Sequence, residues 1–120
     1  MRVHHIAIQV ADLESCSRFY REVLGLVPAP ESRPDAAWFR LGDALLMLEH
    51  VGGAVHAEPF ATDRPGLHLL ALAITAAERR TWEERFRVTN VEIVHQTPHT
   101  LYVRDPEGNR IALSSWPDAG

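Results

Sequence analysis

The chain has 120 residues, 46% of them hydrophobic and 23% charged, and a formal net charge of −4 at pH 7. This length predicts a single domain spanning residues 1–120, with a core large enough to fold without a disulfide or a structural metal. The composition excludes a disordered or fibrous protein. The negative charge argues against binding to nucleic acid or anionic membranes, and no apolar run reaches the roughly 20 residues that a membrane span needs.

The basic residues and the cysteine content narrow the chemistry further. All 12 basic residues are arginine, so the chain has no lysine for a Schiff base or a P-loop. Cys16 is the only cysteine, which excludes an intrachain disulfide and a multi-cysteine zinc site. Because no charged segment followed by an apolar stretch marks an export signal, we expect a cytoplasmic protein.

The first half of the chain, residues 1–50, predicts a β-α-β-β-β module. Ile6, Ile8 and Val10 recur two residues apart, which is typical of a strand with one apolar face. Asp12 is a candidate N-cap for a helix whose apolar residues recur at intervals of three and four. We expect a strand over 3–10, a helix over 13–24 ended by Gly25, a short extended piece over 26–28, and strands over 36–41 and 44–50.

Residues 67–116 repeat the same order of elements. Between the halves, residues 51–66 are rich in glycine, proline and polar side chains and lack periodicity, which indicates a connecting loop. Residues 105–108, Asp-Pro-Glu-Gly, predict a hairpin because proline fixes φ and glycine accepts positive φ. We expect a strand over 67–74, a helix over 76–86, and strands over 91–95, 100–104 and 109–115.

This internal repeat predicts an α+β fold made of two tandem βαβββ modules, residues 1–50 and 67–116. Each module has one sheet whose single helix covers one face only. The uncovered faces of the two sheets are therefore expected to meet or curve together, with the helices outside. They leave an open cleft lined by alternate strand residues.

Three stretches of sequence resemble one known family. They are HHIAIQVADLE at 4–14, FYREVLGL at 19–26 and YVRDPEGNRI at 102–111. In this order and spacing they are similar to the vicinal oxygen chelate superfamily, which includes glyoxalase I, methylmalonyl-CoA epimerase, extradiol dioxygenases, and fosfomycin and bleomycin resistance proteins. The resemblance implies paired βαβββ modules that form a U-shaped mixed sheet, commonly in a dimer. It also implies, for many members, a divalent metal bound by the first and last strands of each module.

Carried over to this sequence, the resemblance implies four metal-ligand positions, of which one keeps a ligand. The first-strand histidine falls on His5. Its partner in the first module falls on Met47, and the second-module positions fall on Leu69 and Ala112. Leucine and alanine carry no donor, and the methionine thioether is too soft for a hard divalent ion. We therefore expect no metal, which resembles the bleomycin-resistance type, and a small, largely apolar molecule bound in the cleft.

A register shift restores a metal site and gives an alternative prediction. Moving the second-module alignment by one residue brings His68 into the cleft, and Glu49 shares the strand face of Met47. His5, His68 and Glu49 then form a two-histidine-one-carboxylate set for divalent Fe, Mn, Ni or Zn in a lyase, isomerase or dioxygenase, with Tyr102 as proton donor. The shift turns every side chain of the strand to the opposite face. Whether the chain is an enzyme stays open, as does a third reading in which side chains fill the cleft and the chain only dimerises.

The expected partners are a small-molecule ligand and a second copy of the chain in a homodimer. His5 also suits proton transfer or recognition of an acidic ligand. Arg40 and Arg104 are further candidates for pairing with an anionic ligand, although arginines are more often exposed. The residues predicted to line the ligand pocket are His5, Met47, Glu49, Leu69, Tyr102 and Ala112.

Overall fold

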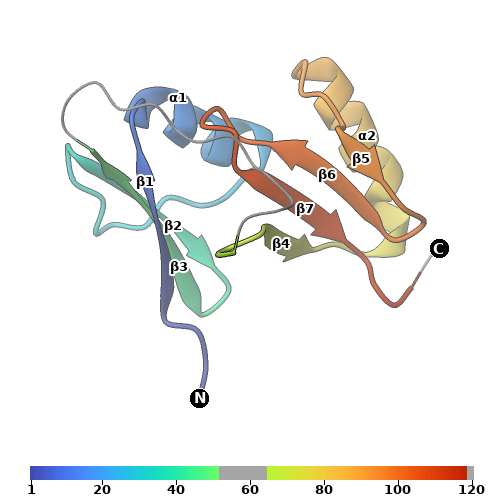
Figure 1. Cartoon of the computed structure of the whole chain (residues 1–120), viewed down its shortest axis with the longest axis horizontal. Helices are drawn as coiled ribbons and strands as arrows, with labels where there is room; N and C mark the ends of the chain where they lie inside the picture. Colours follow the sequence, from blue (N-terminus) through green and yellow to red (C-terminus); the bar gives the residue numbers. More distant parts are fainter. Residues whose placement is uncertain (52–64, 119–120) are drawn as a thin grey trace. The chain divides into compact units, whose positions relative to one another are not determined.

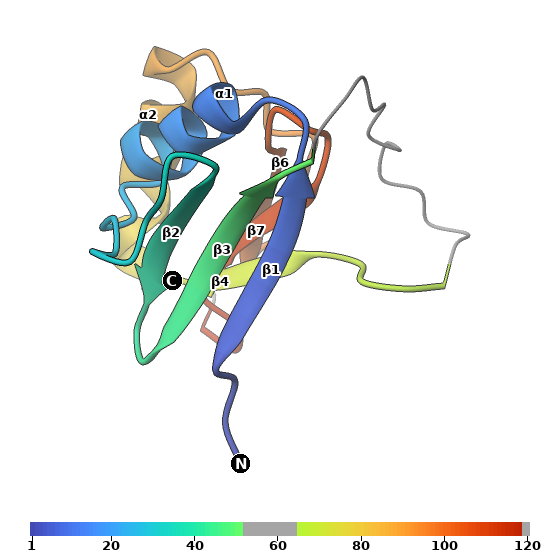
Figure 2. The ribbon, with the colours of Figure 1, turned by 90° about the vertical axis from the view of Figure 1, so that its left-hand side faces the viewer.

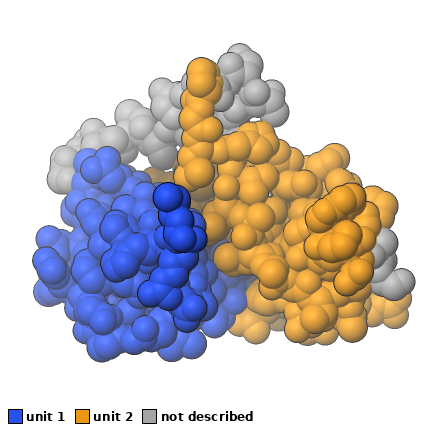
Figure 3. Space-filling model, turned by 90° about the horizontal axis from the view of Figure 1, so that it is seen from below, with its two compact units in different colours: residues 1–58 blue, residues 59–120 orange. Residues whose placement is uncertain are grey.

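A computed structural model describes residues 1–51 and 65–118 (Figure 1). The chain divides into two compact units, Met1–Glu58 and Pro59–Gly120, which Figure 3 shows in separate colours. Most of the predicted connecting loop, residues 51–66, lies outside the described residues, so the module boundaries stay a prediction. Within the described ranges, no helix is long and apolar enough to cross a membrane.

Unit 1 is a three-stranded sheet with one helical segment. Its strands have the order β1-β3-β2, with β1 parallel and β2 antiparallel to the central β3 (Figure 2). The helix begins after Asp12, whose carboxylate accepts a hydrogen bond from the Ser15 amide at 3.0 Å, as the N-cap prediction requires. The elements are β1 (His5–Val10), α1 (Leu13–Arg18), a π-helical turn (Phe19–Val23), β2 (Ala36–Leu41) and β3 (Ala44–His50).

The helix predicted over residues 13–24 changes its winding part-way. After α1 the chain continues as the π-helical turn Phe19–Val23, and the Leu26 amide donates to the Tyr20 carbonyl oxygen at 2.9 Å. Gly25 then adopts φ +72°, the left-handed conformation that ends many helices. The sequence therefore predicts the extent of this helical segment correctly and misses its wider second turn.

The helical segment covers one face of the sheet. Leu46 and Leu48 of β3 are fully buried, as is Tyr20, whose ring centroid is 6.3 Å from that of Phe39 on β2. Alternate residues of the same strands point to the other side of the sheet. We call this side the open face of unit 1; it carries His5, Ala7 and Gln9 of β1, Leu45, Met47 and Glu49 of β3, and Trp38 and Arg40 of β2.

Unit 2 is a four-stranded sheet with the order β4-β7-β6-β5, in which β4 is parallel to β7 and the other neighbours are antiparallel. Figure 1 shows α2 lying alongside these strands. Thr75 and Glu78 form a capping box, each side chain accepting a hydrogen bond from the other residue's backbone amide. The elements are β4 (Leu70–Ala73), a 3-10 turn (Ala76–Glu78), α2 (Arg79–Val88), β5 (His95–Gln96), β6 (Thr100–Arg104) and β7 (Arg110–Ser114).

The sheet of unit 2 also has a core face and an open face. Leu101 and Val103 of β6, and Ile111 and Leu113 of β7, are at most 1% exposed, and Phe86 is the buried side chain of α2. The open face of unit 2 carries the alternate residues of the strands. These are Thr100, Tyr102 and Arg104 of β6, Arg110, Ala112 and Ser114 of β7, and Ala71 and Ala73 of β4.

Two predicted strands of unit 2 are shorter than expected. The strand predicted over 67–74 is limited to Leu70–Ala73, because its partner β7 begins only at Arg110. In place of the strand predicted over 91–95, β5 covers His95–Gln96, so only His95 lies within the predicted range. In both units the first strand in the chain pairs in parallel with the last strand. The strand just before the last in sequence pairs antiparallel with it on its other edge. This arrangement confirms the predicted α+β fold. Unit 1 departs from the predicted β-α-β-β-β order, because residues 26–28 form no strand and Pro28 makes only an isolated bridge to Phe39.

Candidate functional site

Three of the predicted pocket residues lie on the open face of unit 1, at different depths along the sheet. His5 is opposite Leu45, Met47 is opposite Ala7, and Glu49 is opposite Gln9. His5 and Glu49 are therefore offset by four residues along neighbouring strands, roughly 13 Å at the usual rise of a strand. Side chains stand roughly perpendicular to a sheet, so this register does not bring the two together around one ion.

The surroundings of Met47 are aromatic on one side and small on the other. Trp38 lies directly opposite Met47 on β2, while Ala7 lies opposite on β1. The indole Nε1 of Trp38 is buried and has no hydrogen-bond partner among the described residues, and the guanidinium carbon of Arg33 is 5.4 Å from the centre of the Trp38 ring. His5 itself is exposed, with its Nδ1 2.9 Å from that of His4.

The other predicted pocket residues lie in unit 2. Ala112 of β7 is flanked by Ala71 of β4 and Tyr102 of β6, which lie directly opposite it on the two sides. Tyr102 is half-buried and Ala112 is 1% exposed. Leu69 immediately precedes β4 and is half-buried. A row of small and aromatic side chains thus crosses the open face of unit 2.

The two units place corresponding residues at the same points of their sheets. His5 lies two residues before Ala7, which is opposite Met47, and Leu69 lies two residues before Ala71, which is opposite Ala112. The gap-free alignment with the superfamily pattern therefore places the expected ligand positions at the same strand register in both halves. It also makes Glu49 equivalent to Ser114, one position further along the same face than the expected ligand.

The register shift behind the alternative metal set is not the one observed. Leu70 is opposite Ile111 and Leu72 is opposite Leu113, two fully buried residues, whereas Ala71 and Ala73 are exposed. His68 precedes β4, outside the paired strand, and no shifted register turns it toward Ala112. Its Nε2 lies 3.2 Å from Nη1 of Arg110. Because arginine only donates, His68 accepts this hydrogen bond through an unprotonated Nε2.

Arg110 is a prominent feature of this face that the sequence reasoning missed. Its guanidinium carbon lies 4.1 Å from the centre of the Tyr102 ring. The ring centroid of His95, on the neighbouring strand β5, lies 5.4 Å from that of Tyr102. Arg104, which the sequence marked as a candidate for anion binding, lies directly opposite Arg110. The available signal was the spacing, because a residue two positions before Ala112 on one strand shares its face.

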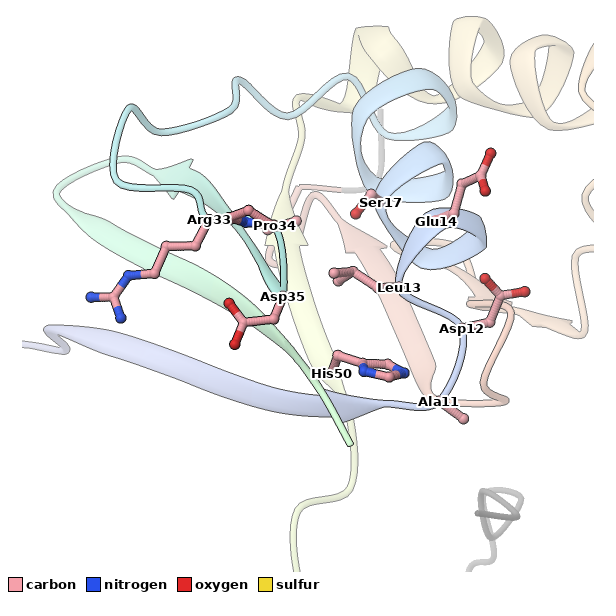
Figure 4. Close-up of a pocket in the computed structure, with 10 residues that line it drawn as sticks. Ala11, Asp12, Leu13, Glu14, Ser17, Arg33, Pro34, Asp35 and His50 are labelled. Carbon is pink, nitrogen blue, oxygen red and sulfur yellow. The ribbon is translucent and has the colours of Figure 1, made fainter. Parts of the chain in front are cut away.

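A groove of about 810 Å³ lies in unit 1 where β1 leads into α1 (Figure 4). Asp12 and Glu14 lie on its α1 side, and the side chain of Arg33 extends away from them (Figure 4). Both acids are engaged, Asp12 with the Ser15 amide and Glu14 with Arg18, each at 3.0 Å. None of the predicted pocket residues is among its lining, which is Ala11, Asp12, Leu13, Glu14, Ser17, Arg33, Pro34, Asp35, Ala37 and His50.

Comparison with known proteins identifies the family. The family model of the Glyoxalase/Bleomycin resistance protein/Dioxygenase superfamily matches residues 2–113. The chain belongs to this superfamily. Mitochondrial methylmalonyl-CoA epimerase of Mus musculus is 40% identical over 58 residues, which are 44% of this chain and 33% of that protein. The match thus spans about a third of the length of the mouse relative.

Two solved structures share the fold over nearly the whole chain. A lactoylglutathione lyase from Agrobacterium tumefaciens superposes with a TM-score of 0.70 at 21% identity, covering 98% of this chain and 97% of its own. A glyoxalase/dioxygenase from Nostoc punctiforme superposes with a TM-score of 0.77 at 22% identity, covering 93% and 88%. At these identities the likeness extends to the fold and not to the chemistry of the site.

The residues at the implied ligand positions do not fit the divalent metal that the superfamily suggests. Of His5, Met47, Leu69 and Ala112, only His5 carries a donor for a hard divalent ion. In the part of the chain that the structure describes, no group of three or more histidine, cysteine or acidic side chains is placed to hold a metal.

Proposed function

We propose that this member of the superfamily binds a small, largely apolar molecule on the open faces of its sheets, without a resident metal. The observation that carries the proposal is the shared register of Met47 and Ala112, the two positions at which the resemblance expects ligands on the last strands. Both positions are apolar. An apolar ligand is stabilised there by about 25 cal/mol for each Å² of apolar surface removed from water.

The small residues beside these positions support the proposal. Ala7 lies opposite Met47, and Ala71 lies opposite Ala112, so neither neighbour extends beyond Cβ. The aromatic rings of Trp38 and Tyr102 lie on the other side of Met47 and Ala112. Ligand pockets are commonly lined in this way, by apolar and aromatic side chains with few polar groups.

A binding titration of the full chain with 1-octanol, followed by NMR, tests the proposal. We expect saturable shifts of the residues on the open faces and weaker binding by about tenfold or more in Leu69→Asp, because a charge beside the ligand must lose its water. Leu67→Asp is the matched control, since Leu67 is 80% exposed. Shifts confined to the groove in Figure 4, or no saturable shift, would contradict the proposal.

Metal retention separates this proposal from the alternative. The alternative is a metal-dependent lyase, isomerase or dioxygenase that uses His5, His68 and Glu49. Superfamily membership and the presence of His5 favour it, whereas the four-residue offset between His5 and Glu49 argues against it. We expect the chain, after incubation with Fe(II), Mn(II), Ni(II) or Zn(II) and removal of unbound ion, to retain much less than one ion per chain. Stoichiometric retention that His5→Ala and Glu49→Ala both abolish would favour the alternative. The expected homodimer stays a prediction, which sedimentation of the full chain tests.

A further inference from the structure

We infer that the open face of unit 2 also binds an anionic group of the ligand, a carboxylate or phosphate, through Arg110 and Arg104. The inference rests on the proposed function, because it specifies the ligand of the same face. It changes the expected ligand from a purely apolar molecule to one with an apolar body and one oxyanion.

The first support is the fixed position of the Arg110 guanidinium. Its carbon lies 4.1 Å from the centre of the Tyr102 ring, within the range of a cation–π contact. Nη1 donates to Nε2 of His68 at 3.2 Å. Two contacts from different segments therefore orient the guanidinium, so less side-chain entropy is lost when it binds an oxyanion.

The second support is the pairing of like charges. Arg104 and Arg110 lie directly opposite each other on β6 and β7, so their Cβ atoms are roughly 4.5–5.5 Å apart on the same face. Like charges in this position destabilise a sheet. A bound anion between them would reverse that effect, because each guanidinium can then make charge-assisted hydrogen bonds to it.

Asp105, the acidic residue next to the pair of Arg104 and Arg110, forms hydrogen bonds within the hairpin between β6 and β7. Asp105 follows Arg104 and is 4% exposed. Its carboxylate accepts hydrogen bonds from the Glu107 amide at 3.0 Å, the Asn109 amide at 2.8 Å and the Asn109 side-chain amide at 2.9 Å. These three donors orient the Asp105 carboxylate into the turn. Arg104 itself is exposed.

The neighbouring side chains determine the rest of the ligand. Ala112 is two residues from Arg110 on the same face, with Ala71 and Tyr102 opposite it. Extending the β4–β7 register by one residue places Leu69 beside Arg110. An anion at the two arginines therefore has its attached chain over an apolar row. The ligand class that fits is an amphiphilic acid, with carboxylate and phosphate as the two candidate headgroups.

Titration of the full chain with four probes tests this inference: octanoate, octyl phosphate, the neutral 1-octanol and inorganic phosphate. We expect the better of the two charged amphiphiles to bind about tenfold or more tightly than octanol, as expected for hydrogen bonds to a charged group. Comparison of octanoate with octyl phosphate identifies the headgroup. Weak binding of inorganic phosphate alone is expected, because it lacks the apolar chain.

Substitutions assign the effect to the arginine pair. Arg110→Gln should weaken the charged amphiphile about tenfold more than octanol, and Arg104→Gln should act in the same direction. Arg80→Gln, an exposed position on α2, removes an equal charge and should change neither affinity. Equal affinity for octanol and both charged probes, or equal effects of Arg110→Gln and Arg80→Gln, overturns the inference and leaves the proposed function standing. Failure of every amphiphile to bind overturns both.

Discussion

Tyr102 and Ala112 lie directly opposite each other on β6 and β7, as Trp38 and Met47 do on β2 and β3. In each unit an aromatic ring thus faces the residue at the position where the superfamily resemblance expects a carboxylate or other donor. An aromatic ring beside a small or flexible apolar side chain offers contact surface to an apolar ligand and no charge to a metal. Two of the predicted pocket residues, Tyr102 and Ala112, meet in this pair.

Ala112→Leu is expected to reduce ligand binding by occupying the space beside Tyr102. Ala112 is 1% exposed, so the larger side chain also crowds its neighbours and should lower the free energy of unfolding by about 1–3 kcal/mol. Octanol titration and urea unfolding measure the two effects. Ala77→Leu, at an exposed position of the 3-10 turn, is the control and should leave both within error. Undiminished octanol affinity in a folded Ala112→Leu protein would place the ligand elsewhere.

Asp105→Ala is expected to destabilise the hairpin between β6 and β7 by about 2–3 kcal/mol, because removal of the carboxylate leaves its three donors without an acceptor. Urea denaturation measures the change. Asp43→Ala, in the exposed turn of the other hairpin, is the matched control. The Asp43 carboxylate forms an exposed ion pair with the Arg2 guanidinium at 3.8 Å. Asp43→Ala should therefore change the free energy of unfolding by less than about 0.5 kcal/mol. Similar losses in the two variants would refute the assigned role of Asp105.

Thr75→Ala is expected to lower the free energy of unfolding by about 1 kcal/mol, because the Thr75 hydroxyl caps the helical segment that leads into α2. Thermal unfolding measures the difference. Thr81→Ala lies on the exposed side of α2 and should instead be neutral or slightly stabilising, since alanine is the better helix former. The capping assignment fails if Thr75→Ala and Thr81→Ala have the same melting temperature.

Arg87→Gln is expected to raise the pKa of Glu84 back towards its usual value. The hydrogen bond from Arg87 lowers the pKa of this carboxyl, burial opposes that shift, and the charge of Arg87 adds to the lowering. A lowered carboxyl pKa stabilises the fold above the unfolded pKa, and this contribution is lost as the pH falls through the folded pKa. Carboxyl NMR titration should show the shift in Arg87→Gln and not in the control Arg40→Gln, a substitution on β2 of unit 1. An unchanged Glu84 titration would mean that the pair does not persist in solution.

The sequence alone determined the local features of this chain. Strands over residues 36–41, 44–50 and 100–104 form at the predicted bounds, because alternation of apolar and polar side chains and tight turns are local properties. Gly25 ends the first helical segment at the predicted place. The three motifs also indicated the superfamily, which the match over residues 2–113 confirms.

Only the tertiary structure decided which strand positions lie side by side. The pairing of β4 with β7 places Ala71 beside Ala112, and the pairing of Arg104 with Arg110 brings two like charges onto one face. These residues are separated by up to about forty positions in the chain, so no periodicity within either segment specifies their register. The register follows from burial of Ile111 and Leu113 on the core face, which is a property of the packed sheet as a whole.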